Sequence, residues 1–278
     1  MILSQAPDIG AAIFEHTSDS HFIELPFGLG TAHLPTGWKL LGIDVSPTKH
    51  VVFMILAAVL VFITIRVAGR QVQRRHREGK APGGFGAAIE AVVLFVRDDV
   101  AIANIGHNGA KFAPYILTLF FFILYCNLLG LVPWGATPTG NLAVTGALAL
   151  TAFLTIEISG VVALGPRGYL KTIFFVPPGM KGLGAVAMLL IMTPIEVIGK
   201  LVKPFALCLR LFANMTAGHF VILALLGLIF LFANWGVAIG SVAFVLFMMS
   251  LELLVAFLQA YIFALLTSVF IGMMQHEH

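Results

Sequence analysis

Two very long apolar stretches in the second half of the chain restrict what it can fold into. They run from Gly184 to Asn234 and from Val237 to Met273, about 51 and 37 residues. As helices they would be roughly 75 and 55 Å long, whereas a hydrocarbon core is about 30 Å thick. Either the first stretch forms two upright spans, or both are over-long helices that lie steeply tilted as an antiparallel hairpin reversing at Trp235–Gly236.

The composition agrees with a membrane protein. Hydrophobic residues make up 59% of the chain and charged residues only 10%, whereas an ordinary soluble domain carries about a quarter charged residues. A soluble globular fold is therefore excluded. Six of the sixteen Lys and Arg residues fall between Arg66 and Lys80, and such a cluster beside an apolar segment is an orientation signal rather than a nucleic-acid footprint.

Three further spans are expected upstream of the hairpin, at about 51–68, 112–132 and 141–165. The basic cluster follows the first of them, so the positive-inside rule places the loop 69–111 in the cytoplasm and the polar segment 1–50 outside. Within that loop, 85–105 mixes apolar and charged residues, which favours an interfacial amphipathic helix. A second cytoplasmic loop is expected at 166–183, and the C-terminus on the same side.

The expected fold class is an all-α multi-pass membrane protein. It has three roughly upright transmembrane helices, an interfacial amphipathic helix and the long tilted antiparallel hairpin, with 51–278 forming a single transmembrane domain. The segment 1–50 shows neither a cleaved signal peptide nor a transit peptide. A bacterial inner (plasma) membrane is therefore expected, with the mitochondrial inner membrane as the alternative.

Polar side chains inside the hairpin are few. A charge at mid-membrane costs at least about 2.5 to 3.5 kcal/mol on insertion scales, so these groups must face one another, water or a partner protein. They are Glu196, Lys200, Lys203, Arg210, Asn214 and His219 in the first stretch and Glu252 and Gln259 in the second. We favour the hairpin because its reversal brings His219 opposite Glu252, and also Arg210 opposite Gln259.

Arg210 is the central candidate for function. A guanidinium has a pKa above about 12, so it stays a permanent cation at membrane depth. An opposite charge within about 4 to 6 Å lowers the pKa of a carboxylic acid by about 1 to 3 units, enough to drive proton release from a passing acid. The alternative is a charge that snorkels to an interface or closes an ion pair with Glu196 or Glu252.

His219 and Glu252 can titrate or share a proton, and with Asn214 and Gln259 they would line a wet path. Their alternative role is an interhelical salt bridge that only fixes the hairpin.

The remaining polar positions each have two interpretations. Glu196 is either a proton relay or the i,i+4 partner of Lys200, and Lys200 and Lys203 are expected to snorkel to the cytoplasmic interface. Glu157, inside the third upstream span, can add a polar group to an external or internal access path. Asn127 is expected to make an interhelical hydrogen bond.

The sequence has no motif for nucleotide, metal or hydrolytic chemistry. It contains no GxxxxGK[ST], HExxH or GxSxG pattern. Cys126 and Cys208 lie in apolar runs, where a cysteine packs as a small apolar group. No cofactor, metal site or disulfide is expected.

Residues 207–219 closely resemble the signature of the ATP synthase subunit a family, the stator of the membrane-embedded proton motor. Residues 194–204 and 252–263 match the same family. The resemblance implies two tilted helices around a rotating ring of c subunits that carry mid-membrane carboxylates, with two offset aqueous half-channels. The partners that it implies are the c ring, the peripheral stalk subunit b, the rest of the F-type complex and membrane lipid. We expect this chain to bind neither nucleic acid nor a nucleotide, and to catalyse no reaction alone.

The resemblance also implies a role for each matching residue. Arg210 is the essential ring-facing cation, and Glu196 lies in the cytoplasmic exit path. The external half-channel contains Asn214, His219, Glu252 and Gln259.

Two departures from the family pattern concern the proposed path. Many bacterial members carry Glu at the position of His219 and His at the position of Glu252. This chain keeps both residue types in exchanged positions, so the pair is expected to act as a unit. Many also carry Asp where this chain has Gly130, which leaves open whether Glu157 supplies that carboxyl group.

The mechanism implied is rotary. A proton that enters through His219 and Glu252 neutralises a ring carboxylate, and after nearly a full turn Arg210 promotes its release to the cytoplasm; each proton crossing about 100 mV yields roughly 2.3 kcal/mol. The alternative functions are a stand-alone proton-coupled secondary transporter and an ion channel. A transporter usually shows internal repeats, and the sequence has no second copy of the Arg210 segment.

Overall fold

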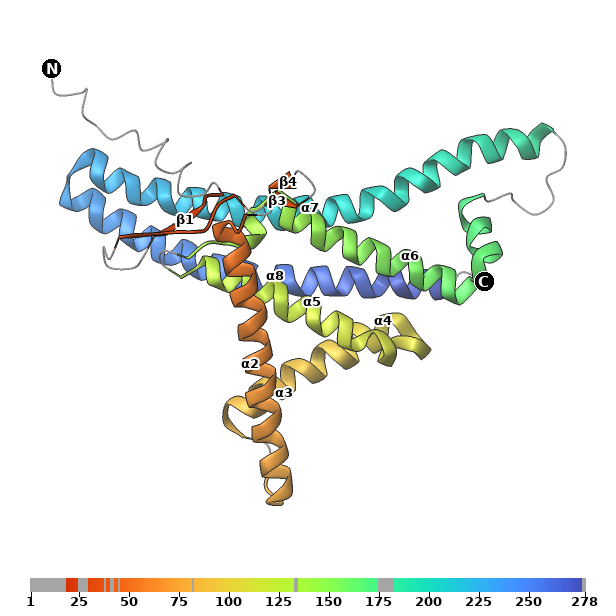
Figure 1. Cartoon of the computed structure of the whole chain (residues 1–278), viewed down its shortest axis with the longest axis horizontal. Helices are drawn as coiled ribbons and strands as arrows, with labels where there is room; N and C mark the ends of the chain where they lie inside the picture. Colours follow the sequence, from red (N-terminus) through yellow and green to blue (C-terminus); the bar gives the residue numbers. More distant parts are fainter. Residues whose placement is uncertain are drawn as a thin grey trace.

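The computed structural model shows a helical protein with short strands near its N-terminus (Figure 1). It describes residues 19–24, 30–37, 39–40, 43–44, 46–81, 83–132, 135–174 and 183–276. The strands form two antiparallel pairs, β1 (Phe22–Glu24) with β2 (Thr31–His33) and β3 (Lys39–Leu40) with β4 (Ile43–Asp44). Much of the segment 1–50, including residues 1–18, lies outside the described residues.

The helices follow one another with short connections. They are α2 (Lys49–Arg77), α3 (Gly84–Phe95), the π-helical η3 (Val96–Ile102), α4 (Ala103–Ile105), the 3₁₀ turn η4 (Gly106–Asn108), α5 (Gly109–Gly130), the 3₁₀ turn η5 (Pro138–Gly140), α6 (Leu142–Ile173), α7 (Leu183–Phe232) and α8 (Trp235–His276). The stretch 85–105 is thus helical, although it combines α- and π-helical geometry.

Five helical segments of the described chain are long and apolar enough to cross a membrane. They are Lys49–Arg77, Gly84–Gly130, Leu142–Ile173, Val186–Phe232 and Trp235–Gln275. The predicted class of helical multi-pass membrane protein is therefore confirmed.

Helices α7 and α8 are continuous and pack against each other. Two upright spans over 184–234 would need a reversal inside this stretch. Helix α7 instead continues through 50 residues, although Pro194 and Pro204 lie within it. In Figure 1 the two helices lie together at the end where they are joined and diverge towards the other end. The first stretch is therefore one long helix rather than two.

The reversal lies two residues earlier than the sequence predicts. Ala233 has a φ of 44°, and the Asn234 side-chain oxygen accepts a hydrogen bond of 2.8 Å from the Gly236 amide. Asn234 therefore caps α8, because a side-chain oxygen at this position satisfies an amide of the first turn. Trp235 and Gly236 belong to the helix itself instead of the turn.

Two helices extend into segments expected to be loops. Helix α2 continues to Arg77, because its Arg and Gln residues are good helix formers and its basic last turn complements the helix dipole. In α6 the backbone breaks at Gly165, with a φ of 70° that glycine tolerates, and helical residues resume at Pro166 and continue to Ile173. The expected loops 69–111 and 166–183 therefore both begin with helix.

Helix α8 lies at the centre of the packing, in contact with α5, α6 and α7 (Figure 1). Its Ala256, Ala260 and Ala264, spaced four residues apart, have no exposed surface. Small side chains on one face allow helix backbones to approach closely, which is the usual basis of helix packing in membranes. This close packing fixes the register in which the polar residues of α7 and α8 meet.

Candidate functional site

The His219 imidazole and the Glu252 carboxylate meet between α7 and α8, as the hairpin register predicts. His219 Nδ1 lies 3.0 Å from Glu252 Oε1. Glu252 is 5% exposed, and neither of its oxygens has a well-aligned hydrogen bond to another described residue. The two atoms are thus at ion-pair distance, and His219 is an ionisable side chain in contact with this buried carboxylate.

The second ring nitrogen of His219 reaches the end of α5. His219 Nε2 lies 2.9 Å from the Gly130 carbonyl oxygen and 3.1 Å from Thr137 Oγ1, while Nδ1 also lies 3.1 Å from the Met215 carbonyl oxygen. Both nitrogens therefore have oxygen neighbours that accept hydrogen bonds. A ring with this surrounding can hold a proton at either nitrogen and exchange it with a neighbour.

Thr137 occupies the space beside Gly130. A Cβ built at Gly130 would come far inside contact distance of Thr137 Oγ1 and 2.7 Å from its Cβ. The position where many bacterial relatives were expected to carry Asp is therefore filled here by a hydroxyl that bonds to His219. Glu157 does not supply the carboxyl group at this place, because its contacts lie with Tyr169 and Lys200.

A second buried network joins α5, η5 and α8. Asn127 Nδ2 donates to the Ala256 carbonyl oxygen at 3.2 Å, and Thr139 Oγ1 donates to Asn127 Oδ1 at 2.6 Å. Asn127 and Thr139 are 1% and 0% exposed. The predicted interhelical hydrogen bond of Asn127 is confirmed, and the separate hydrogen bond from Thr139 to Asn127 holds the loop that carries Thr137 against α5.

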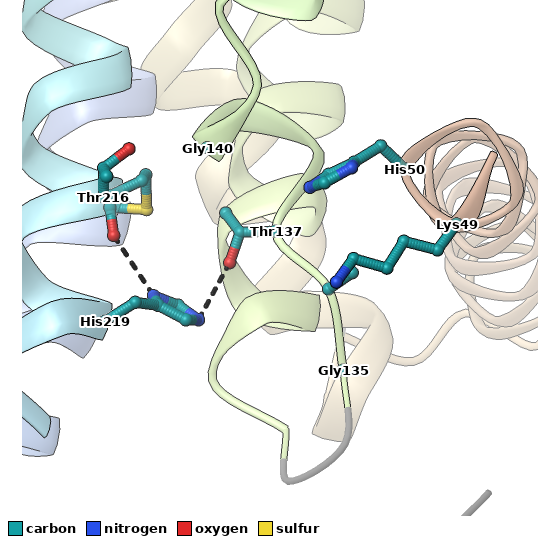
Figure 2. A pocket seen from close by; sticks show the side chains of 9 residues that line it. Lys49, His50, Gly135, Thr137, Gly140, Thr216 and His219 are labelled. Carbon is teal, nitrogen blue, oxygen red and sulfur yellow. Dashed lines mark hydrogen bonds between the residues drawn. The ribbon is translucent and has the colours of Figure 1, made fainter. Parts of the chain in front are cut away.

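A small cavity of about 30 Å³ adjoins His219 (Figure 2). We call it the His219 cavity; its walls are Lys49, His50, Gly135, Ala136, Thr137, Gly140, Met215, Thr216 and His219. Thr216 Oγ1 is buried and has no hydrogen-bond partner among the described residues. The cavity has room for a water molecule, which needs about 10 to 15 Å³ and several polar neighbours.

Arg210 lies on the exposed face of α7. Ala206, Ala213, Asn214 and Ala217 are exposed beside it, one to two turns away on the same side. Within the described residues its guanidinium has neither an ion pair nor a hydrogen bond. A permanent cation is thus presented on a surface of small side chains, where another helix can approach closely.

The expected contact of Arg210 with Gln259 is not formed. Gln259 is buried, with 6% exposure, whereas Arg210 points to the exposed side of α7. The alternatives of an ion pair from Arg210 to Glu196 or Glu252 are also wrong within the described residues. The antiparallel register places residues at the same level, but only the rotation of each helix decides whether they face each other.

A second cavity of about 30 Å³, the Glu196 cavity, lies between α6, α7 and α8. Its walls are Phe153, Ile156, Glu157, Glu196, Lys200, Lys203, Pro204, Phe270, Met273 and Met274. Tyr169 donates a hydrogen bond from its hydroxyl to Glu157 Oε2, and Lys200 Nζ lies 3.9 Å from the same oxygen. The two carboxylates, Glu157 and Glu196, thus share one cavity with two lysines.

The lysines of this cavity have partners within the protein. Lys200 Nζ donates to Thr172 Oγ1 at 3.3 Å and lies 4.5 Å from the centre of the Tyr169 ring, while Lys203 Nζ lies 4.8 Å from the centre of the Phe270 ring. The alternative i,i+4 pair of Glu196 with Lys200 is not formed. Lys200 turns instead towards α6, because Glu157 and Thr172 offer it oxygen atoms there.

The two cavities lie on either side of Arg210 along α7. His219 is nine residues beyond Arg210 and Lys203 is seven before it, which corresponds to about 13 and 10 Å of helix. The exposed cation is thus flanked by one polar cavity towards each end of the helix. Such an arrangement separates two groups of titratable side chains by a fixed positive charge.

The described residues contain no group of three or more His, Cys, Asp or Glu side chains placed to hold a metal ion. Cys126 and Cys208 are buried and free.

The sequence patterns missed Thr137 and Thr139, which lie in the turn between α5 and α6, and singled out the neighbouring Gly130 only through the family pattern. This turn carries no helical periodicity, and its partners are 12 to 89 residues away. Only the missing acidic residue at Gly130 gave a signal that this position was unusual.

The fold and the site together define a class: a multi-pass helical membrane protein with a permanent cation exposed between two polar cavities. The family model described as "ATP synthase A chain" matches residues 51–272. The chain belongs to this family, and the resemblance stated from the sequence is confirmed.

Curated relatives agree with this assignment. The protein of Chloroherpeton thalassium named "ATP synthase subunit a" is 48% identical over 94% of this chain and 76% of its own length. The "ATP synthase subunit a" of Myxococcus xanthus is 51% identical over 85% of this chain and 76% of its own length. The "ATP synthase subunit a 2" of Chlorobaculum tepidum is 46% identical, with 95% and 72% covered.

Proposed function

We propose that this chain is the proton-translocating stator subunit of a rotary F-type ATP synthase. The observation that carries the proposal is Arg210, a permanent cation exposed on the small-residue face of α7 between two polar cavities. A cation on an apolar surface is costly unless a partner of opposite charge or water covers it. The names of the relatives support the same function.

The His219 side forms the external half-channel in this proposal. His219 and Glu252 pass the proton inwards, and Gln259, two turns farther along the same side of α8, continues the polar path towards the level of Arg210. Asn214 completes the path at the exposed face, one turn from Arg210. The contact of His219 with Glu252 supports the view that they act as a unit.

Arg210 acts electrostatically on the ring. A carboxylate carried past it by a c subunit is stabilised in its ionised form, so the proton leaves towards the cytoplasmic side. Because the guanidinium keeps its own proton, it does not conduct, and its charge repels protons that would otherwise cross directly. Coupling to rotation follows because the two half-channels communicate only through ring sites.

The Glu196 cavity forms the cytoplasmic exit in this proposal. Glu196 lies on its wall together with Glu157, Lys200 and Lys203. We assign Glu157 to this exit rather than to the external path, because it lines the same cavity as Glu196. Carboxylates near lysines can take up and release protons that leave the ring.

The membrane arrangement completes the proposal. The segment 1–50 lies outside, the C-terminus lies in the cytoplasm, α2, α5 and α6 are the roughly upright spans, and α7 and α8 lie tilted along the ring. The helical stretch 85–105 lies at the cytoplasmic interface. The c ring covers the exposed Arg210 face, subunit b contacts the chain elsewhere, and the chain binds no nucleotide and catalyses no reaction alone, in a bacterial inner membrane.

The test is Arg210→Ala in the complete complex reconstituted into liposomes. Proton-driven ATP synthesis and ATP-driven proton pumping should both be lost, while the complex still contains the ring. Arg167→Ala, which removes an exposed arginine outside both cavities, is the matched control and should leave both rates unchanged. Near-normal pumping by Arg210→Ala would exclude the proposed role.

A stand-alone transporter or ion channel makes a different prediction. The purified chain alone in liposomes would then conduct protons, whereas the stator proposal expects coupled transport only with a ring present.

A further inference from the structure

The described part of the N-terminal segment contacts two residues of the His219 cavity wall, His50 and Lys49. Asp19 Oδ1 lies 2.7 Å from His50 Nδ1, at the beginning of α2. Asn141 Nδ2 donates to Asp19 Oδ2 at 3.2 Å, and the Lys49 amide donates to the Ser20 carbonyl oxygen at 2.9 Å. The start of α2 and Asn141 therefore both hold Asp19 in place beside His50.

His50 connects this contact with the site on α7. It is 4% exposed and forms part of the cavity wall to which His219 also belongs. Figure 2 shows the His50 ring extending from α2 towards the Thr137 loop, with His219 on the other side of that loop's threonine. Two histidines thus line one water-sized space, and the buried Thr216 hydroxyl lacks a protein partner in the same wall.

Asp19 differs from His50 in its access to solvent. Its side chain is 32% exposed, whereas that of His50 is 6% exposed. Burial raises the pKa of Asp19, but its hydrogen bonds and electrostatic interaction with the His50 residue, together with a hydrogen bond from Thr48, outweigh this effect and leave its pKa below the ordinary value of 3.8. Asp19 is therefore ionised at neutral pH and holds the ring from the solvent side.

We propose that His50 is the outermost proton-binding group of the external half-channel, and that Asp19 positions it. The inference rests on the proposed stator function, and goes beyond it by adding a proton-binding group in α2 and a positioning residue in the segment before it. The charged and titratable groups that face His50 are Asp19, Lys49 and His219.

The proton transfer uses one ring atom. The Asp19 carboxylate accepts a hydrogen bond from Nδ1–H, which fixes this tautomer and leaves the Nε2 lone pair as the exchanging position. Nε2 takes a proton from water at the mouth of the cavity, and the ring becomes an imidazolium. Nε2 then gives that proton to water inside the cavity, from which His219 receives it, and the ring returns to its starting tautomer.

The alternative is a structural clamp in which the Asp19–His50 contact only ties the N-terminal segment to α2. The two interpretations differ in the effect that they expect when His50 is replaced by a side chain that hydrogen-bonds but cannot take up a proton. His50→Gln retains a group that can hydrogen-bond to Asp19 but cannot take up a proton at neutral pH. A clamp would tolerate this change, whereas the relay would not.

The test is the complete ATP synthase in liposomes, with proton-driven ATP synthesis as the rate. We expect His50→Gln to slow synthesis about tenfold with the ring still bound, a modest loss for a proton-transfer group because water remains in the path. His33→Gln, which changes an exposed histidine of β2 outside the cavity wall, is the matched control and should keep the rate. A normal rate for His50→Gln would overturn the proposal.

Chemical rescue gives a second, independent result. In His50→Ala the vacated ring space adjoins the cavity, so imidazole added on the N-terminal side should restore most of the rate. Failure of imidazole to raise the rate of an intact His50→Ala complex would favour the clamp and overturn the relay. Arg210→Ala should stay inactive with imidazole; an active Arg210→Ala complex would instead contradict the stator function itself.

The role of Asp19 is tested by its two conservative variants. Asp19→Asn should lower the rate and change its dependence on external pH, because the ring loses its anionic partner. Asp19→Glu should recover part of the rate by restoring the carboxylate. An unchanged pH profile in Asp19→Asn would show that Asp19 does not position the proton-binding ring.

Discussion

Gly218 gives the Glu252 carboxylate its place against α7. A Cβ at Gly218 would lie 2.5 Å from Glu252 Oε1 and 2.9 Å from its Cδ. The carboxylate can therefore reach His219, the residue after Gly218, only because position 218 has no side chain. The position of a titratable group thus depends on a glycine in the opposite helix.

Gly218→Ala should displace Glu252 and impair ATP synthesis more than it impairs assembly. Overpacking of this kind costs about 1 to 3 kcal/mol, and the thermal stability of the complex and the proton-driven rate measure its two effects. Gly240→Ala on α8 is the matched control, because a Cβ there meets no atom within 4 Å. Equal behaviour of the two variants would contradict the proposed fit.

Exchange of the two titratable residues should preserve part of the function. The double variant His219→Glu with Glu252→His keeps a carboxylate and an imidazole in contact, so it should be more active than either single variant. Contacting residues commonly show coupling free energies of about 0.5 to 3 kcal/mol. A double-mutant cycle on synthesis rates checks this, and additive losses would mean that the pair does not act as a unit.

Gly130→Asp alone should lower the thermal midpoint and the rate of ATP synthesis. Both losses should be smaller when Gly130→Asp is combined with Thr137→Gly. The Thr137 side chain fills the space that a residue at position 130 needs, so the single variant overpacks the turn beside His219. Removal of that side chain frees the space for a carboxylate near His219. Thermal midpoints and synthesis rates of the two single variants and the double variant decide whether the positions compete for space.

Asn127→Ala should destabilise the protein by about 1 to 3 kcal/mol, because it leaves the buried Thr139 hydroxyl without its acceptor and removes the hydrogen bond that joins α5 to the Ala256 carbonyl oxygen of α8. The free energy of unfolding of the chain in detergent measures this. Thr118→Ala is the control, since the exposed Thr118 hydroxyl bonds only to the Pro114 carbonyl oxygen of its own helix. Similar losses in both variants would argue against the interhelical network.

Acid should weaken the attachment of the N-terminal segment to α2. Because the pKa of Asp19 is lowered in the folded protein, its contribution to stability is present above about pH 4, the ordinary carboxyl range, and is lost as the pH falls through the folded value. Hydrogen exchange of the Lys49 amide, bonded to Ser20, should therefore be less protected in strong acid. Asp19→Asn should lack this acid-dependent step.

Part of the site could be predicted from the sequence because helices are periodic. Seven residues return a side chain to nearly the same direction, and an antiparallel pair fixes which levels meet, so the contact of His219 with Glu252 followed. The same reasoning failed for Arg210 and Gln259. Gln259 is buried among the packed helices, whereas Arg210 faces outwards.

The sequence by itself determined the class of protein, since its apolar runs are too long and too poor in charge for a soluble fold. It also determined the long hairpin and the residue types that carry charge within it. Only the tertiary structure placed Thr137 beside Gly130, Glu157 beside Glu196, and Asp19 beside His50. These contacts depend on turns and on the rotation of helices about their axes, and neither leaves a periodic signal in the sequence because both arise from packing between distant segments.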